Sequence, residues 1–477
     1  MAEMQWRLAD MAAALPGARL VGDGAQSVAR IHTDSRSLQA GDLFLALRGE
    51  KFDAHAFLPE AARLGAVAGV AEHGLAAAGL SGWEVADTRE ALGALAQHWR
   101  GRYTLPLIAV TGSNGKTTVT QMIAQILRTA AGEAALATQG NLNNEIGVPQ
   151  TLLRLRPTHR LAVVELGMNH PGEIMRLARW CQPSVALVNN AQREHQEFMA
   201  SVEAVADENA SVFDHLSADG VAVFPHADAF ASRWRERAKG RRVMTFDLDV
   251  HSQASVRLLQ AQWQVDHWQL RMATPQGEAE LSLWIAGRHN LANALAATTC
   301  ALAAGVDLQT IVAGLSAFQA VQGRSRACAM ARVNGDPWTL IDDTYNANPD
   351  SVLAAIDVLA SLPAPRALVL GDMGEVGHQG PAFHAEVGAY ARRQGIEVLL
   401  ALGELSAHAV QAFGAGGRHF ATWDALQGAL AGALGGAASV LVKGSRFMRM
   451  ERVVQALQSS APDSRHGAPH QESQPCS

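Results

Sequence analysis

The sequence predicts an α/β protein of three domains: a small α/β N-terminal domain (1–100), a central parallel-sheet domain (101–325) and a C-terminal Rossmann-like domain (326–458). The chain of 477 residues is too long for one hydrophobic core, which favours several domains. Apolar runs of strand length alternate with helical patterns, as is typical of parallel sheets covered on both faces. This alternation begins near residue 101 and starts again near residue 327.

Each domain contains segments with a clear pattern. In the first domain a strand is expected at 42–47, followed by the helical stretch "HAFLPEAARLGA". A central helix is expected because apolar residues recur on one helical face between Val119 and Leu127. Residues 262–285 predict an antiparallel hairpin around the turn "TPQG". The tail, 459–477, is rich in Ser, Pro, Gln and His and is expected to be disordered. The other expected strands are 105–110, 161–165, 185–190, 339–343, 366–372, 397–403 and 439–444.

The composition argues against several classes of function. Contents of 48% apolar and 18% charged residues describe an ordinary soluble protein, and a net charge of −6 argues against broad nucleic-acid binding. The four cysteines include no C-x-x-C pair, so no zinc site is indicated. The N-terminus lacks the apolar core of a signal peptide, and no uncharged apolar run approaches the roughly 18 residues of a membrane span. We therefore expect a cytoplasmic protein without membrane insertion.

The stretch "VTGSNGKTT" resembles a phosphate-binding loop but departs from the pattern G-x-x-x-x-G-K-[ST], because Val110 occupies the place of the first glycine. A predicted strand precedes the loop and a predicted helix follows it, so backbone N–H groups and the helix N-terminus would face an anion. Lys116 is expected to reach the β- and γ-phosphates, and Thr117 to offer its hydroxyl to Mg²⁺. The alternative is a tight turn with a solvated lysine. The predicted ATP loop comprises Gly112, Ser113, Asn114, Gly115, Lys116, Thr117 and Thr118.

Two further residues are expected at the same edge of the central sheet. Glu165 ends the apolar strand "LAVVE", where a carboxylate is costly unless it is paired or binds a metal. Ligands of parallel sheets gather at the carboxyl ends of the strands, so a role of Glu165 on Mg²⁺ is predicted. An ion-paired or helix-capping glutamate is the alternative. His195 follows the next expected strand, and an ordinary surface histidine is the alternative there.

Longer motifs extend over residues 28–455 and resemble those of the Mur ligases, whose own phosphate loop has the short form "TGSNGKTT". Folylpolyglutamate synthetase is a more distant relative with a similar loop. The motifs that carry the resemblance are "TDSRSLQAGDLFLALRGEKFDAHAF", "TGSNGKTT", "GNLNNEIGVPQTLL", "VVELGMNHPGEI", "AGRHNLANALAA", "IDDTYNANPDS", "LGDMGEVG" and "LVKGSR".

The resemblance implies a division of labour among the three domains. The first would bind the UDP end of the substrate, the second would be the P-loop ATPase domain, and the third would close over the site and bind the incoming amine. The implied reaction is ATP-dependent peptide-bond formation in peptidoglycan synthesis, with Mg²⁺ as cofactor. UDP-N-acetylmuramoyl-tripeptide would supply a carboxylate that becomes an acyl phosphate, and D-alanyl-D-alanine would supply the amine. A monomer is also implied.

The resemblance also assigns roles to residues, beginning with Arg324 as a γ-phosphate clamp, although Arg326 lies two positions away. Lys443 and Arg446 are matched to a carboxylate site, with a solvent-facing charged strand end as the alternative. The catalytic set is Lys116, Glu165, His195 and Arg324, and the metal set is Thr117, Glu165 and His195. Further nucleotide contacts are His289, Asn290, Asn293 and Asp343. Ser35 and Arg36 match the uridine site, Asn141, Asn143 and Asn144 the muramoyl-peptide site, and Tyr345, Asn346, Asn348 and Asp372 the D-alanyl-D-alanine site.

One position departs from the family pattern. Mur ligases generally carry a carbamylated lysine fourteen residues after the histidine matched to His195, and this chain has Asn209 there. No lysine occurs between Lys116 and Lys239, so no carbamate can form on this segment. The amide of Asn209 could accept a hydrogen bond or contact a metal, and Glu208 could supply the missing negative charge. We predict an enzyme without bicarbonate activation.

Two alternative functions remain open at this level. One is another ligase of the same superfamily, although the roughly 100 residues before the glycine loop argue against a folate ligase. The other is an ATP-driven switch or regulatory binding protein, which would hydrolyse or bind ATP without needing an acceptor.

Overall fold

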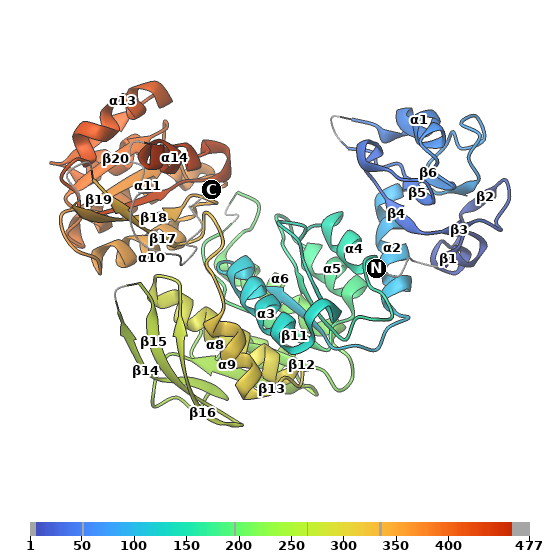
Figure 1. The fold of residues 1–477 in the computed structure, drawn as a ribbon, viewed down its shortest axis with the longest axis horizontal. Helices are drawn as coiled ribbons and strands as arrows, with labels where there is room; N and C mark the ends of the chain where they lie inside the picture. Colours follow the sequence, from blue (N-terminus) through green and yellow to red (C-terminus); the bar gives the residue numbers. More distant parts are fainter. Residues whose placement is uncertain (1–5, 50–51, 195–196, 265, 333–335, 460–477) are drawn as a thin grey trace, which may run out of the picture.

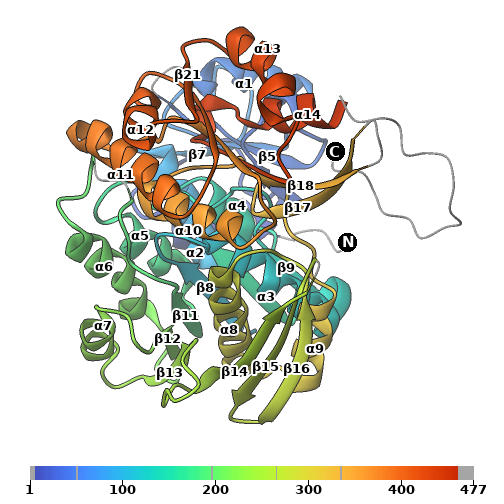
Figure 2. The ribbon, with the colours of Figure 1, turned by 90° about the vertical axis from the view of Figure 1, so that its left-hand side faces the viewer.

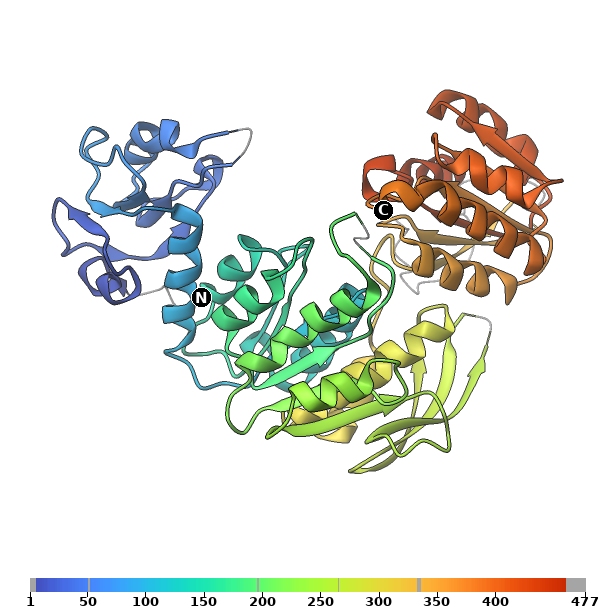
Figure 3. The ribbon, with the colours of Figure 1, turned by 180° about the vertical axis from the view of Figure 1, so that it is seen from behind.

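The computed structural model describes residues 6–49, 52–194, 197–264, 266–332 and 336–459. Three units, each built on a sheet, follow one another along the chain. The N-terminal and C-terminal units stand on either side of the central unit and form an open arc with it (Figures 1 and 3). The predicted α/β class with three sheet-based units is confirmed. The prediction of a disordered tail lies almost wholly outside the described residues.

The N-terminal unit contains a five-stranded sheet in the order β2-β7-β6-β5-β4, in which β4 to β7 are parallel and β2 is antiparallel. The predicted strand at 42–47 is β5, and the predicted helical stretch forms a 3-10 turn followed by α1. The elements are β1 (Trp6–Arg7), β2 (Arg19–Val21), β3 (Ser27–Val28), β4 (Arg30–His32), β5 (Asp42–Leu45), α1 (Leu58–Arg63), β6 (Ala68–Ala71), β7 (Gly82–Glu84) and α2 (Thr88–Arg100).

The central unit contains a nine-stranded sheet in the order β16-β15-β14-β13-β12-β11-β8-β10-β9. Strands β8 to β14 are parallel, and β15 and β16 form the predicted antiparallel hairpin at one edge. The strands are β8 (Leu107–Thr111), β9 (Ala135–Ala137), β10 (Leu161–Glu165), β11 (Val185–Val188), β12 (Val221–Pro225), β13 (Arg242–Asp247), β14 (Val256–Trp263), β15 (Trp268–Thr274) and β16 (Gly277–Leu283). The helices are α3 (Lys116–Ala131), α4 (Gly147–Leu152), α5 (Glu173–Cys181), α6 (Val202–Ala210), α7 (Ala231–Arg237), α8 (Arg288–Ala303) and α9 (Leu308–Ser316).

Both faces of the central sheet are buried, which explains its continuous apolar strands. Successive side chains of a strand point to opposite faces. Leu107 and Ala109 therefore pack in the core formed with α2, α5 and α6, whereas Ile108 and Val110 pack in the core formed with α3, α8 and α9. Because both sets must be apolar, the strand shows no alternation. This two-sided packing fixes β8, and with it the loop that follows.

The C-terminal unit contains a six-stranded sheet in the order β17-β18-β22-β19-β20-β21, which is parallel except for β17. Figures 1 and 2 place α10 at the base of this unit, on the side of the central α8. The strands are β17 (Arg326–Ala331), β18 (Pro337–Asp343), β19 (Arg366–Gly371), β20 (Val398–Leu402), β21 (Gly417–Phe420) and β22 (Ser439–Lys443). The helices are α10 (Pro349–Ala360), α11 (Gly380–Arg393), α12 (Ser406–Phe413), α13 (Trp423–Leu434) and α14 (Glu451–Ser459). Among the described residues, no helix combines the length and apolarity that a membrane span requires.

Candidate active site

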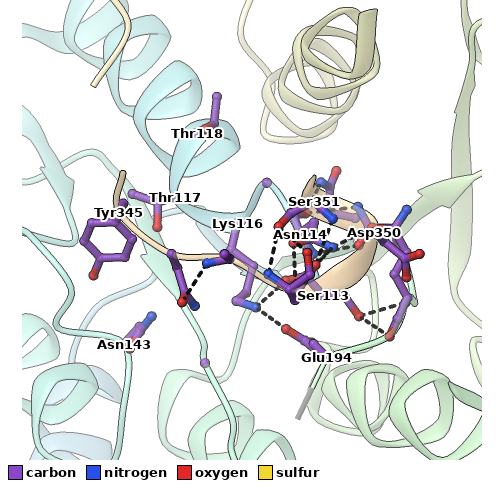
Figure 4. A pocket seen from close by; sticks show the side chains of 18 of the residues that line it. Ser113, Asn114, Lys116, Thr117, Thr118, Asn143, Glu194, Tyr345, Asp350 and Ser351 are labelled. Carbon is purple, nitrogen blue, oxygen red and sulfur yellow. Dashed lines mark hydrogen bonds and ion pairs between the residues drawn. The ribbon is translucent and has the colours of Figure 1, made fainter. Parts of the chain in front are cut away.

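A cavity of about 1290 Å³ lies where the central and C-terminal units face each other. Its walls come from the carboxyl ends of central strands, from the N-termini of α3, α8 and α10, and from loops of the C-terminal unit. Residues far apart in sequence thus meet around one volume, and Figure 4 shows part of this wall. The position agrees with the rule that ligands of open α/β sheets bind at the carboxyl ends of the strands.

The predicted phosphate loop runs from the end of β8 into the start of α3. Gly112 has φ +129° and Gly115 has φ +79°, values that glycine adopts without steric cost. A Cβ atom on Gly115 would also lie 2.6 Å from the Oδ1 atom of Asn293. The loop therefore needs glycine at this position both for its backbone angle and for its close approach to α8. The α3 N-terminus follows directly, so its unpaired N–H groups face the cavity.

Lys116 is held in the cavity by three oxygen atoms. Its Nζ atom donates to the carbonyl oxygens of Gly112 at 2.5 Å and Ser113 at 2.9 Å, and it lies 3.3 Å from Oε2 of Glu194. Figure 4 shows the Lys116 and Glu194 side chains pointing toward each other. The ammonium group is thus kept beside the loop that would hold phosphates. The alternative of a solvated turn lysine is wrong, since this side chain is only 15% exposed.

Glu165 lies at the end of β10 and is 1% exposed. Its Oε1 atom accepts hydrogen bonds from the Thr117 hydroxyl at 3.0 Å and from the Asn143 amide at 2.8 Å. Its Oε2 atom is buried without a hydrogen-bond partner in the described part of the chain. A buried carboxylate oxygen next to a threonine hydroxyl is a suitable pair of hard ligands for Mg²⁺. The residues present therefore fit the metal that the phosphate loop implies.

Asn209, the residue at the family's lysine position, is fully buried beneath the phosphate loop. Its Oδ1 atom accepts from the Thr111 hydroxyl at 2.6 Å and from the Gly112 N–H at 2.9 Å, and its Nδ2 atom donates to the Val205 carbonyl at 3.0 Å. The amide oxygen thus accepts hydrogen bonds, which is one of the two roles predicted for it from the sequence. Glu208, the other residue considered there, does not line the cavity, and its Oε1 atom accepts from the Ile174 N–H at 2.9 Å.

The predicted nucleotide residues of α8 reach the same cavity and also support the loop. Asn293 Oδ1 accepts from the Asn189 amide at 3.0 Å, and Asn293 Nδ2 donates to Asn290 Oδ1 at 2.8 Å. His289 lines the cavity beside Asn290, and burial lowers the pKa of its imidazole. Burial therefore favours the neutral imidazole, whose Nε2 atom accepts from the Asn290 amide at 3.1 Å and whose Nδ1–H is then the donor.

The C-terminal unit contributes several predicted residues to the opposite wall. The Arg324 guanidinium stacks on the Tyr345 ring, with 4.0 Å between the guanidinium carbon and the ring centroid. Lys443 is not a solvent-facing strand end, because its side chain is 4% exposed and its Nζ atom donates to Asp343 Oδ2 at 2.6 Å and to the Asn346 carbonyl at 2.9 Å. Asp343 therefore already has a cation as partner.

Most of the predicted site residues are brought together, and a few are not. Asp372 does not line the cavity: its carboxylate accepts from the N–H groups of Leu405 and Ser406 at the start of α12. His195 lies outside the described residues. The other predicted residues that do not line the cavity are Gly112, Asn141, Ser35 and Arg36. Those that line it are Ser113, Asn114, Gly115, Lys116, Thr117, Thr118, Asn143, Asn144, Glu165, His289, Asn290, Asn293, Arg324, Asp343, Tyr345, Asn346, Asn348, Lys443 and Arg446.

Sequence reasoning missed a group of residues in the loop after β11. Gln192, Arg193 and Glu194 line the cavity and contact both units that form it. The available signal was a run of polar residues directly after an apolar strand, at the sheet edge that the phosphate loop marks. That signal identifies the location of the segment. It does not identify the partners of Arg193, which belong to the C-terminal unit.

Comparisons with known proteins agree with this geometry. The family model "Mur ligase middle domain" matches residues 110–301, "Mur ligase, glutamate ligase domain" matches 329–446, and "Mur ligase family, catalytic domain" matches 27–100. The UDP-N-acetylmuramoyl-tripeptide–D-alanyl-D-alanine ligase of Haemophilus influenzae is 38% identical over 449 residues, covering 92% of this chain and 96% of that protein.

Solved structures show the same architecture. MurF from Acinetobacter baumannii superposes with a TM-score of 0.89 at 34% identity, covering 96% of this chain and all of that one. The MurF ligase from Thermotoga maritima, solved in complex with ADP, shares the fold with a TM-score of 0.78 at 23% identity, covering 90% of this chain and 97% of that one. The three family matches and the near full-length relatives together establish that the chain belongs to the Mur ligase family.

Proposed function

We propose that this protein joins D-alanyl-D-alanine to UDP-N-acetylmuramoyl-tripeptide in peptidoglycan synthesis, with hydrolysis of ATP to ADP and phosphate. The observation that carries the proposal is the single cavity in which Lys116 and Glu165 of the central unit face Tyr345 and Asn346 of the C-terminal unit. The relatives that the chain matches along most of its length bear the name of this activity.

The central unit supplies the groups for phosphoryl transfer. The N–H groups at the α3 N-terminus and the Lys116 ammonium would hold the β- and γ-phosphates of ATP. Thr117 Oγ1 and Glu165 Oε2 would hold Mg²⁺, which neutralises charge on the phosphates. The terminal carboxylate of the tripeptide attacks the γ-phosphorus to give an acyl phosphate and ADP. Preorganised positive charge lowers this barrier because carboxylate and triphosphate repel each other.

The C-terminal unit supplies the second half of the reaction. The amino group of D-alanyl-D-alanine attacks the acyl phosphate carbonyl, and phosphate leaves from the tetrahedral intermediate. Tyr345, Asn346 and Asn348 lie on the wall opposite the phosphate loop, where they would position this amine. Arg324 is stacked on Tyr345 at the same wall, from which its guanidinium would reach the γ-phosphate as the units close. We assign Ser35 and Arg36 to the uridine end and Asn143 and Asn144 to the muramoyl-peptide.

Three further features belong to the same proposal. The functional domains span about 1–100, 101–325 and 326–458, as the strand-helix alternation and the three family matches suggest. The substrates are a nucleotide precursor of the cell wall, a dipeptide and ATP, which supports a cytoplasmic location. We also propose a monomer, which the resemblance to the Mur ligases implies.

Phosphate release measured with the four combinations of the two substrates tests the proposal. We expect release that requires both UDP-N-acetylmuramoyl-tripeptide and D-alanyl-D-alanine, and none above background with either alone. Lys116→Ala should abolish it, while Lys239→Ala, at a 77% exposed side chain in the same unit, should not. Acceptor-independent hydrolysis of ATP would instead support the alternative of an ATP-driven switch, and unimpaired ligation by Lys116→Ala would refute the assignment of the site.

A further inference from the structure

The segment Gln192-Arg193-Glu194 contacts the phosphate loop along one side. The Gln192 N–H donates to the Ser113 hydroxyl at 2.9 Å, and Gln192 Oε1 accepts from the Asn114 amide at 2.6 Å. Glu194 is the carboxylate beside Lys116. The segment thus contacts three residues of the loop, Ser113, Asn114 and Lys116. Any force on the segment is therefore transmitted to the groups that would hold the phosphates.

The other side of the segment is tied to the C-terminal unit through Arg193. Its backbone N–H donates to Asp350 Oδ2 at 2.7 Å, and its Nε and Nη2 atoms donate to Asp350 Oδ1 at 3.0 and 2.6 Å. Its Nη1 atom donates to Glu386 Oε2 at 2.8 Å, and the guanidinium lies 5.4 Å from the Phe383 ring centroid. The Asp350 hydrogen bonds, with the Glu386 carboxylate, raise the pKa of Arg193 above its ordinary value. The cation is therefore permanent at any relevant pH.

Helix α10 touches the central unit at both of its ends, through contacts of different kinds. At its N-terminus, Asp350 holds Arg193, and the Asn348 amide donates to Asn114 Oδ1 of the phosphate loop at 2.9 Å. Toward its C-terminus, Val358 packs with Ala286 of the central unit in one apolar cluster. An apolar contact tolerates rotation, because dispersion and burial have little directionality. Asp350 accepts from the Arg193 backbone N–H with one oxygen and from the guanidinium with the other, and charge-assisted hydrogen bonds of this kind hold only within a narrow range of angles.

We propose that Arg193 is a positioning residue that holds the C-terminal unit in the orientation seen here relative to the phosphate loop, while the apolar contact at the other end of α10 serves as a pivot. The inference rests on the proposed function, because the C-terminal wall would hold the incoming amine and the loop would hold the γ-phosphate. With Arg193 in place, both reactants keep one mutual geometry. Without it, Asp350 and Glu386 of the C-terminal unit lose the cation that attaches them to the central unit, so the C-terminal unit is held less firmly at this end.

Arg193→Gln tests the proposal, because glutamine keeps a donor but removes the charge and the fork. The matched control is Arg237→Gln. Arg237 also donates twice to one carboxylate, that of Asp214 inside the central unit, with bonds of 3.0 and 2.6 Å and a comparable side-chain exposure of 30%. For Arg193→Gln we expect kcat/KM for D-alanyl-D-alanine to fall roughly tenfold or more, with the Kd for ATP analogue within about twofold. Arg193→Lys keeps the charge but not the forked guanidinium. Its kcat/KM should therefore lie between the values of the wild type and Arg193→Gln.

Two further measurements separate this inference from the proposed function. Small-angle X-ray scattering of the nucleotide-free protein should give a larger radius of gyration for Arg193→Gln than for wild type and Arg237→Gln. A cycle of Arg193→Gln, Asp350→Asn and the double variant should be strongly non-additive in scattering and in kcat/KM. The proposal is overturned if Arg193→Gln matches Arg237→Gln in both measurements, or if the cycle is additive. A wild-type protein without ligase activity would refute the proposed function, and scattering would still decide the role of Arg193.

Discussion

Substitution of Asn209 by alanine tests how the phosphate loop is held. The amide is fully buried and forms hydrogen bonds with Thr111, Gly112 and Val205. Alanine removes both acceptor contacts at once. The Thr111 hydroxyl and the Gly112 N–H then lose their partner at a place where the surrounding atoms exclude bulk water.

The expected cost follows from these contacts. A buried donor left without a partner costs about 1–3 kcal/mol, and two are left here. The Val205 carbonyl keeps its place in α6, so the loss of its bond to the Asn209 side chain adds little to the free-energy cost. Water that enters the space of the lost amide recovers part of the loss, so about 3 kcal/mol is a reasonable net figure. For a domain of this size, that value corresponds to a fall in Tm of roughly 6–12 °C.

Thermal unfolding followed by calorimetry measures this effect, and ATP analogue titration measures its consequence for the site. We expect weaker nucleotide binding in Asn209→Ala, because the Gly112 N–H loses the group that orients it. Gln427→Ala is the control, since Gln427 is a solvent-exposed amide in α13 of the other unit. An Asn209→Ala protein that melts within a degree or two of wild type and binds nucleotide equally well would refute the supporting role of Asn209.

Three other results follow from the site and the fold. Bicarbonate added to CO₂-depleted buffer should leave the ligation rate unchanged, because no lysine lies between Lys116 and Lys239; marked stimulation would contradict this. Glu165→Gln keeps the acceptor for Thr117 but removes the charge, so the Mg²⁺ concentration for half-maximal activity should rise roughly tenfold or more, and an unchanged Mg²⁺ titration would exclude Glu165 as a ligand. Burial lowers the pKa of His384 below 6.5, so the stabilisation by its neutral ring is complete above pH 6.5 and is lost as the pH falls toward the folded-state pKa. Tm should therefore fall less between pH 7.5 and 5.5 in His384→Gln than in wild type, and equal slopes would show that His384 does not contribute.

The strands that the sequence predicted well are long, apolar and covered on both faces. The predicted segments at 105–110 and 161–165 correspond to β8 and β10, and that at 366–372 corresponds to β19. β12 (Val221–Pro225) carries the same signal and was overlooked, whereas two other strands that were not predicted lack it. β9 is the three-residue edge strand Ala135–Ala137, and β21 at the other sheet's edge reads "GRHF". Short or polar edge strands are defined by their neighbours more than by their own residues.

The same distinction applies to the site. The phosphate loop could be predicted because its strand, glycines, lysine and helix are contiguous in sequence. The partners of Arg193 could not, since Asp350 and Glu386 are 157 and 193 positions away and belong to another unit. Asp372, which the resemblance matched to the D-alanyl-D-alanine site, does not line the cavity, because its carboxylate accepts from the N–H groups at the start of α12.

The supports of the phosphate loop are neutral amides, and this has an electrostatic consequence. Asn209 accepts from the Gly112 N–H, and Asn190 Oδ1 accepts from the Asn114 N–H at 2.8 Å. The Asn189 amide donates to the Asn114 carbonyl at 2.8 Å. A carboxylate could accept the same N–H groups, but its charge would repel a triphosphate a few ångströms away. Amides fix the backbone without this penalty, so they add no negative charge to that of Glu194 beside Lys116, and the α3 N-terminus stays free to attract the phosphates. Asn209→Asp should therefore weaken ATP binding more than it weakens the fold, and the reverse order in nucleotide titration and calorimetry would show that geometry alone governs this position.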